Sequence, residues 1–382
     1  MNLTDFERQE TPFYYYDLQL LDATLNAIRE AVEDAPHFHV HYAVKACATP
    51  AVLKKIAQAG LGADCVSGGE ILRAVENGFP ASDIVYAGVG KTDREIRTAL
   101  EHNIAAFNVE SIPELEVINE LASEMGRTAR VAFRINPNVD AHTHEKITTG
   151  LNENKFGISM QDMIPAIRMA ESLKHIDFIG LHFHIGSQIT SFVPFAELCK
   201  CINQLTAALE AEDIMVRSIN VGGGLGIDYD CPDEHPIPDF NGYFNTFKKH
   251  LKLRPGQELH FELGRAVVAQ CGQLVSRVVY VKHGLQKHFA IIDAGMTDLV
   301  RPAMYGSFHK PVNLSAEARG EQATDQYDIV GPICESSDVF VKDYTLPLTR
   351  RGDIILLKSA GAYGEIMASQ YNCRKLPGSI AE

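Results

Sequence analysis

The sequence lacks any uninterrupted apolar run long enough to cross a bilayer, and residues 1–10 contain neither a basic segment nor an apolar one. Basic residues are also scarce, because 35 Lys and Arg stand against 49 Asp and Glu and give a formal net charge of −14. A balance of this sign disfavours non-specific binding to nucleic acid or to anionic membranes. We therefore expect a cytoplasmic protein that holds any anionic ligand with local groups.

Paired cysteine motifs are missing as well, since the eight cysteines are scattered without a CxxC pair. This spacing indicates neither a disulfide framework nor a zinc ribbon, and we expect no metal site. The remaining composition is that of an ordinary globular protein: 382 residues, with 46% hydrophobic and 22% charged side chains. A chain of this length can build two sizeable hydrophobic cores, so two domains are expected.

From about residue 39 onward the sequence repeats one pattern, in which a short β-rich run precedes an amphipathic stretch with apolar residues three and four positions apart. Eight strands alternating with helices predict an α/β fold with a (β/α)8 TIM barrel rather than an open doubly wound sheet. The strands are expected at 39–44, 62–66, 84–87, 105–109, 131–135, 178–184, 218–221 and 259–262, and the helices at 18–32, 50–58, 69–76, 93–101, 112–125, 162–173, 193–209 and 243–251.

Beyond the eighth strand the long helical segments stop, and β-branched and aromatic runs predict a C-terminal β-rich domain of the sandwich or barrel type. Residues 12–16, with three consecutive tyrosines, are expected to add a strand to it. The predicted domains are therefore a barrel at 30–265 and a β-rich domain made of 1–29 and 266–382. The polar stretch 313–325 is expected to be a loop. Strands of this domain are expected at 267–281, 289–293, 327–330, 339–344 and 354–357.

Unusual side chains follow the ends of the predicted strands, where a TIM barrel places its chemistry. Lys45 ends the first strand. The free amine of a desolvated lysine can form a Schiff base, although a solvated lysine is the commoner explanation of one such residue. After the seventh strand, Gly222, Gly223 and Gly224 could turn their amides toward a phosphate, or could simply permit a tight turn.

The sixth and eighth strands end in further polar groups. His182 and His184 face the same side of a strand, so they could be satisfied core histidines, could bind a metal, or could let His184 stack on an aromatic cofactor. No third histidine or carboxylate cluster accompanies them, which favours stacking. Glu262 could hold a pyridine nitrogen protonated, or pair with Arg265 in a salt bridge. With the lysine and the glycine loop, these groups predict a site for pyridoxal 5'-phosphate.

Nearly the whole chain resembles the fold-type III pyridoxal phosphate decarboxylases, and within them the branch that acts on diaminopimelate. Cys47, Leu263 and Gln370 depart from the pattern of the family, although none of them replaces a group with a chemical role. The resemblance is carried by ordered motifs that are jointly highly specific: YAVKA at 42–46, SGGE at 67–70, HIGSQ at 184–188, GGGLG at 222–226, ELGR at 262–265, DAGM at 293–296, RPAMY at 301–305, GPICESSD at 331–338 and ASQYN at 368–372.

The resemblance implies a role for each group at the barrel mouth. Lys45 would carry the cofactor, His184 would stack on its ring and Glu262 would pair with its pyridine nitrogen. Ser187 and the glycine loop would hold the phosphate. The other residues implied to contact the cofactor are Gly264, Arg265 and Tyr371.

The resemblance also implies a homodimer with shared active sites. In such a dimer Cys334 and Glu335 of one subunit would complete the site of the other. A thiol is a competent acid near neutral pH, so Cys334 is expected to return a proton to the carbon that loses CO2. Without the flanking motif, a buried structural cysteine would be the better interpretation.

The choice of substrate is supported by charge and is decided by the resemblance of residues 301–305 to the diaminopimelate branch. Diaminopimelate carries a carboxylate and an ammonium at its far end, and its site needs groups of both signs. Arg265, Arg301 and Tyr305 are expected to bind the distal carboxylate, and Glu335 with Tyr371 the distal ammonium. The expected reaction is the decarboxylation of meso-2,6-diaminopimelate to L-lysine, the last step of lysine biosynthesis.

Other functions stay open at this point. A decarboxylase of the same fold that acts on carboxynorspermidine, ornithine or arginine would bind the same cofactor. A metal-dependent barrel hydrolase would instead use His182 and His184 and would contain zinc. A non-catalytic homologue is disfavoured because the lysine, the glutamate and the cysteine are all present. The alternating histidines at 37–41 are expected to be structural, since they lie near the amino end of the first strand.

Overall fold

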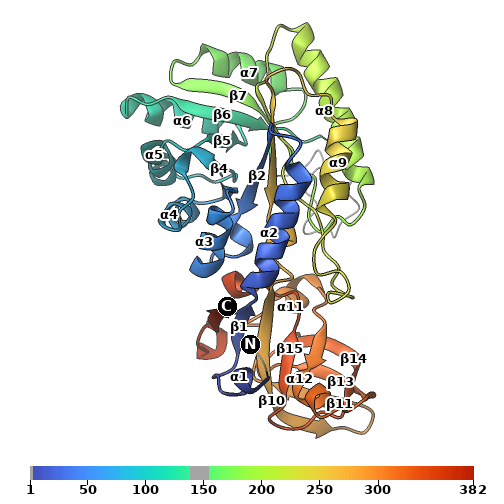
Figure 1. The fold of residues 1–382 in the computed structure, drawn as a ribbon. Helices are drawn as coiled ribbons and strands as arrows, with labels where there is room; N and C mark the ends of the chain where they lie inside the picture. The colour runs from blue at the N-terminus through green and yellow to red at the C-terminus, as the bar shows by residue number, and fades with distance from the viewer. Residues whose placement is uncertain (1–2, 138–154) are drawn as a thin grey trace. The chain divides into compact units, whose positions relative to one another are not determined.

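The computed structural model describes residues 3–137 and 155–382, which form two compact units (Figure 1). In the described part of the chain, no helix is long and apolar enough to cross a membrane. The first unit comprises Met1–Thr24, Ile227–Pro238 and Arg265–Glu382, and the second comprises Leu25–Gly226 and Asp239–Gly264.

The second unit is built on a closed barrel of parallel strands that runs in sequence order from β2 to β9. Pairing of β2 with β9, for example Val40 with Phe261, closes the ring. The predicted TIM barrel is therefore confirmed, and each strand lies within three residues of its predicted bounds. The strands are β2 (Phe38–Ala43), β3 (Gly62–Cys65), β4 (Ile84–Tyr86), β5 (Ala106–Val109), β6 (Ala129–Arg134), β7 (Ile176–His182), β8 (Ser218–Asn220) and β9 (Glu258–Leu263).

Side-chain caps set the starts of several helices between these strands. Ser67 and Ser111 accept hydrogen bonds from the amides three residues on, and Thr92 forms a reciprocal capping box with Glu95. Each such cap stabilises a helix by about 1 kcal/mol. The helices are α2 (Leu18–Val32), α3 (Pro50–Gln58), α4 (Gly68–Glu76), α5 (Asp93–His102), α6 (Ile112–Glu124), α7 (Met163–Ser172), α8 (Val193–Ala211) and α9 (Phe240–His250).

The first unit is a mostly antiparallel sheet organised around its longest strand, β10, which pairs with β1, β11 and β15. The predicted β-rich domain is thus confirmed as a separate sheet. Its strands are β1 (Phe13–Tyr16), β10 (Gly272–His283), β11 (His288–Ile292), β12 (Pro311–Asn313), β13 (Ala323–Val330), β14 (Val339–Pro347), β15 (Ile354–Leu357) and β16 (Gly378–Ala381), and its short helices are α1 (Leu3–Glu7), α10 (Arg265–Val268), α11 (Arg301–Tyr305) and α12 (Leu314–Ala318).

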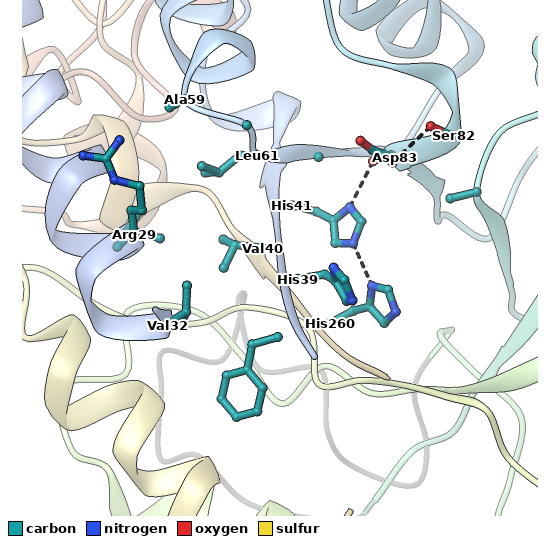
Figure 2. A pocket seen from close by; sticks show the side chains of 15 residues that line it. Arg29, Val32, His39, Val40, His41, Ala59, Leu61, Ser82, Asp83 and His260 are labelled. Atoms are coloured by element: carbon teal, nitrogen blue, oxygen red, sulfur yellow. Dashed lines mark hydrogen bonds between the residues drawn. The ribbon is translucent and has the colours of Figure 1, made fainter. Parts of the chain in front are cut away.

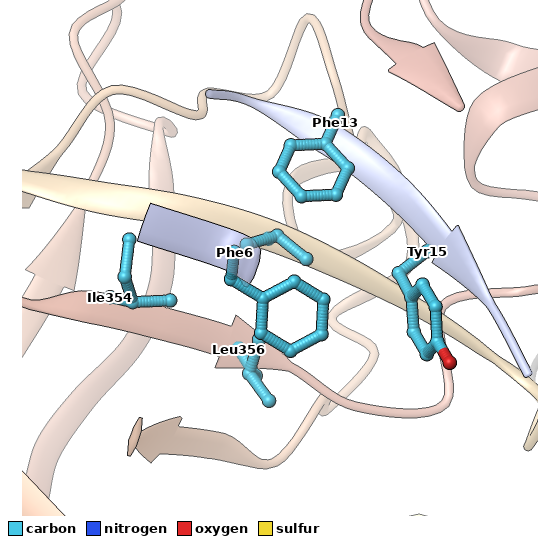
Figure 3. Packing of buried hydrophobic residues seen from close by; sticks show 6 residues of the cluster. Phe6, Phe13, Tyr15, Ile354 and Leu356 are labelled. Carbon is cyan, nitrogen blue, oxygen red and sulfur yellow. The ribbon is translucent and has the colours of Figure 1, made fainter. Parts of the chain in front are cut away.

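An aromatic cluster packs the amino-terminal strand onto this sheet (Figure 3). The ring of Phe6 meets the ring of Tyr15 edge-on, with ring centres 5.3 Å apart. Ile354 and Leu356 of β15 form the other side of the cluster. Burial of one such aromatic side chain contributes about 1.5–3 kcal/mol. The predicted strand at 12–16 therefore belongs to the first unit because its apolar residues are buried there.

Two local predictions were wrong. Residues 313–325 are not a loop, because the side chain of Asn313 accepts a hydrogen bond from the amide of Ala316 at 2.9 Å and caps α12, and β13 begins at Ala323. Strand β10 begins at Gly272 rather than at residue 267, since the residues before it form the helical turn α10. Gly272 packs so closely on Gly361 that a Cβ there would lie 2.2 Å from the Cα of Gly361.

Candidate active site

Lys45 lies at the carboxyl end of the first barrel strand, in the short 3-10 turn η1 (Val44–Ala46). Its Nζ is 3.5 Å from Oδ2 of Asp64, a buried residue of the neighbouring strand β3, while 40% of the lysine side chain stays exposed. Burial, together with the charge of Glu262, raises the pKa of Asp64 to about 7, against the opposing effect of Lys45. Asp64 can therefore hold or release a proton beside the lysine amine near neutral pH.

Glu262 of β9 lies inside the barrel and receives three side-chain hydrogen bonds. Its Oε1 accepts from Asn108 at 3.0 Å and from Asn220 at 2.7 Å, and its Oε2 lies 3.0 Å from Nε2 of His182. Burial opposes the charged form, but the contact with His182 and the charge of Lys45 outweigh it and hold the pKa of Glu262 below its ordinary value. The site thus presents a fixed carboxylate that can stabilise a protonated ring nitrogen.

His182 ends β7 and His184 lies two residues beyond it, and the two histidines have different surroundings. His182 is committed to Glu262, whereas Nδ1 of His184 accepts a hydrogen bond from the amide of Gly223 at 3.3 Å. Burial and the charges of Arg134 and Lys45 lower the pKa of His184 well below its ordinary value. His184 is therefore a neutral ring at pH 7. Within residues 3–137 and 155–382, no group of three or more His, Cys, Asp or Glu side chains is arranged to hold a metal ion.

The glycine loop after β8 has no room for side chains. A Cβ at Gly223 would lie 1.9 Å from the carbonyl oxygen of Glu262, and Gly222 and Gly224 have positive φ angles of 68° and 110°. The amide of Gly222 already donates to the side chain of Asn220 at 2.9 Å, and that of Gly223 donates to His184. Of the three glycine amides, only that of Gly224 has no hydrogen-bond acceptor among the described residues. An anion would therefore be bound from Gly224 onward.

Two buried arginines of the first unit share one tyrosine ring. Cζ of Arg265 lies 5.1 Å from the ring centre of Tyr363, and Cζ of Arg301 lies 5.5 Å from the same ring. Arg301 also packs on Tyr305 at 5.4 Å. Burial lowers the pKa of Arg301, and the positive charge of Arg265 lowers it further. Two like charges held together out of water form a strong binding site for an anion.

The candidate proton donor and the acidic group lie in exposed loops of the first unit. The amide of Cys334 donates to Oδ1 of Asn372 at 3.3 Å, and the hydroxyl of Tyr371 donates to Oε1 of Glu335 at 2.5 Å. Tyr371 belongs to the turn η5 (Tyr371–Cys373) and is 49% exposed. The structure therefore brings together residues from two sequence motifs that lie more than thirty positions apart.

A cavity of about 420 Å³ lies near the opposite, amino-terminal end of the barrel strands (Figure 2). Its polar side is a row of imidazoles: Nε2 of His41 is 2.9 Å from Nδ1 of His260, and the rings of His39 and His260 stack with centres 4.9 Å apart. Nδ1 of His41 is 3.1 Å from the carbonyl of Asp83, and Nε2 of His39 is 2.6 Å from Glu258. These histidines are bound to one another, to the backbone of Asp83 and to the side chain of Glu258, and their structural role stays a prediction.

Several residues of the site carried no signal that the sequence analysis used. Asn108 and Asn220 are polar residues inside short buried strands, and that position could have marked them. Asp64 has the same signature in β3. Tyr363 could not have been found in this way, because its contact with both arginines depends on the fold of the first unit.

Comparison with known proteins gives a consistent result. The family model of the pyridoxal-dependent decarboxylase, pyridoxal binding domain, matches residues 20–269. A diaminopimelate decarboxylase of Bacteroides thetaiotaomicron is 61% identical over 372 residues, which cover 97% of this chain and 95% of the relative. A diaminopimelate decarboxylase of Vibrio cholerae is 44% identical over 364 residues, covering 95% and 85% of the two chains.

Solved structures show the same similarity. The crystal structure of diaminopimelate decarboxylase from Helicobacter pylori complexed with L-lysine superposes with a TM-score of 0.91 at 37% identity, covering 99% of this chain and 93% of the other. A lysine/ornithine decarboxylase from Vibrio vulnificus complexed with putrescine has a TM-score of 0.85 at 21% identity, a similarity that concerns the fold alone.

Proposed function

The chain belongs to the pyridoxal-dependent decarboxylases and, within them, to the diaminopimelate decarboxylase family, and from this premise we propose that it converts meso-2,6-diaminopimelate to L-lysine and CO2. The observation that carries the substrate assignment is Arg301. Arg301 is 7% exposed, and its buried Nε has no hydrogen-bond partner among the described residues. A buried cation of this kind is costly unless an anion of the ligand pairs with it.

Pyridoxal 5'-phosphate fits the residues at the barrel mouth. When bound, it supplies an electron sink for the electron pair that stays behind when CO2 leaves. Lys45 would hold it covalently, since 40% of the lysine side chain is exposed just beyond the end of β2. Glu262, held ionised against the cost of its burial by His182 and the charge of Lys45, would keep the ring nitrogen protonated. The neutral ring of His184 would pack on its face, and the phosphate would lie against Ser187, Gly224 and the residues that follow.

The far end of the substrate would be bound by groups of both signs. Arg265 and Arg301, with Tyr305 packed on the second of them, would bind the distal carboxylate. Glu335 would bind the distal ammonium, with the hydroxyl of Tyr371 orienting its carboxylate. Gly264 would contact the cofactor, and Arg265 would contact both the cofactor and the substrate. An ornithine or arginine decarboxylase would not need two buried arginines at this end.

The remaining roles complete the catalytic cycle. Cys334, an exposed thiol, would return a proton to the carbon that has lost CO2. We place this cysteine, with Glu335, in the active site of a partner subunit, so that the working enzyme is a homodimer. We also assign the protein to the cytoplasm, where it would perform the last step of lysine biosynthesis.

A substrate panel tests this proposal. The purified protein is given meso-diaminopimelate, ornithine, arginine and carboxynorspermidine, and released CO2 is measured for each. We expect release from meso-diaminopimelate only, and a loss of about 100-fold in kcat/KM in Arg301→Gln, because a charge-assisted contact to the carboxylate is removed. Arg350→Gln, which removes an exposed arginine paired with Glu321, is the matched control. Faster release from ornithine, or an unchanged Arg301→Gln enzyme, would overturn the assignment.

A further inference from the structure

The guanidinium of Arg265 is held by a tyrosine that none of the roles above includes. Nη1 of Arg265 donates a hydrogen bond of 2.6 Å to the hydroxyl of Tyr229, and Cζ of Arg265 lies 5.9 Å from the centre of the Tyr229 ring. Tyr229 belongs to the segment Ile227–Pro238, which forms part of the same compact unit as Arg265. It follows three residues after the glycine loop ends at Gly226.

The ring of Tyr229 packs in turn against the ring of His309. His309 meets it nearly edge-on, with ring centres 5.3 Å apart at an angle of 79°. His309 is 1% exposed, and its Nδ1 lies 3.1 Å from the carbonyl of Lys358, which can only accept a hydrogen bond. Burial, aided by the charges of Arg301 and Arg265, lowers the pKa of His309 to about 3. His309 is therefore a buried, uncharged ring, and it adds no positive charge to those of Arg265 and Arg301.

Two carboxylates of the same segment have partners other than Arg265. Asp228, next to Tyr229, binds His235 at 2.8 Å and the amides of Asp230 and Cys231. Asp233 is paired with Lys358 and Lys310. The group of this segment that accepts the hydrogen bond from Nη1 of Arg265 is the hydroxyl of Tyr229. A hydroxyl orients a guanidinium without neutralising it, whereas a carboxylate would do both.

We propose that Tyr229 is a positioning residue, which fixes the plane of the Arg265 guanidinium through a neutral hydroxyl and so does not itself neutralise the charge that binds the distal carboxylate of the substrate. This inference rests on the proposed function, because it concerns the same carboxylate. It makes Tyr229 a determinant of specificity for substrates and products that carry that group. It assigns no role to Tyr229 in the loss of CO2 itself.

The test uses two competing molecules that differ in the distal carboxylate. L-lysine keeps the carboxylate that meso-diaminopimelate presents at its far end, and cadaverine lacks it. Both are measured as competitive inhibitors of the holoenzyme and of Tyr229→Phe, which keeps the ring and loses only the hydroxyl. We expect the inhibition constant of L-lysine and the KM of meso-diaminopimelate to rise about tenfold, as for the loss of one hydrogen bond to a charged group. The inhibition constant of cadaverine, kcat and the visible absorbance of the cofactor should stay within about twofold.

Tyr280→Phe, an exposed tyrosine of β10, is the matched control and should leave every constant unchanged. Equal weakening of L-lysine and cadaverine would show that Tyr229 has only a structural role and would overturn the proposal. Unchanged binding of L-lysine and of cadaverine would also overturn the proposal. Failure of the proposed function would look different, since the unsubstituted enzyme would then release no CO2 from meso-diaminopimelate.

Discussion

Glu262→Gln is the substitution whose effect the structure defines best. The glutamine keeps an oxygen that can accept from Asn108 and Asn220, so the polar network inside the barrel loses only the negative charge and the acceptor for His182. Nδ1 of His182 has no hydrogen-bond partner among the described residues. The ring can therefore move its proton from Nε2 to Nδ1 and accept from the new amide.

The substitution should slow the reaction and should hardly change the stability of the fold. Two unit charges about 4 Å apart at an effective dielectric constant of about 20 attract each other by about 4 kcal/mol. Loss of most of this stabilisation of a protonated ring nitrogen should lower kcat by about 100-fold to 1,000-fold, at 1.36 kcal/mol for each factor of ten. The melting temperature should change by only a few degrees.

The assay compares kcat for meso-diaminopimelate, the visible spectrum and the melting temperature of the two proteins. Asp353→Asn is the control, because Asp353 is also a buried carboxylate, paired with Arg319 at 2.7 Å in the first unit. It should lower the melting temperature and spare kcat. If Glu262→Gln kept kcat within threefold of the unsubstituted enzyme, the assigned role of this carboxylate would be refuted.

Three further outcomes are expected. Gly223→Ala should prevent cofactor binding, seen as loss of visible absorbance, because its Cβ would lie 1.9 Å from the carbonyl oxygen of Glu262; a normal spectrum would contradict this. His41 and His260 have lowered pKa values, that of His260 to about 3, chiefly through burial, so both stay neutral when folded. Stability measured by urea unfolding should therefore be complete above about pH 6.5 and fall at lower pH by up to about 1.4 kcal/mol per unit for each histidine, and His260→Gln should make this fall shallower. Phe6→Ala should lower the free energy of unfolding by about 3–5 kcal/mol, and a change below 1 kcal/mol would show that the cluster in Figure 3 is not a core.

The barrel could be predicted because most of its strands are short apolar runs followed by a helix of clear amphipathic period, and both signals are local. The same reasoning failed at 313–325, where the side chain of Asn313 accepts a hydrogen bond from the amide of Ala316 and caps a short helix. Side-chain networks depend on the register between strands, which no local pattern contains. The sequence therefore pointed to Glu262 but not to Asn108 and Asn220, which hold it from two other strands.

The glycine loop shows a second limit. Its run of glycines predicted amides free for a phosphate, and the need for glycine is clear from the positive φ angles and the close contacts. Two of those amides nevertheless bind Asn220 and His184 inside the barrel. A sequence motif indicates where backbone can approach a ligand, but only the fold decides which of its donors remain available.

The most direct test of the proposed activity is an absorbance spectrum of the purified protein, recorded before and after addition of meso-diaminopimelate, with CO2 and lysine quantified. The assignment predicts a visible band that depends on Lys45, absent from Lys45→Ala, and lysine formed mole for mole with CO2. A visible band without turnover would support the assignment of the cofactor and contradict the assignment of the substrate. No band after incubation with pyridoxal 5'-phosphate would contradict the assignment of Lys45 and the proposed chemistry with it.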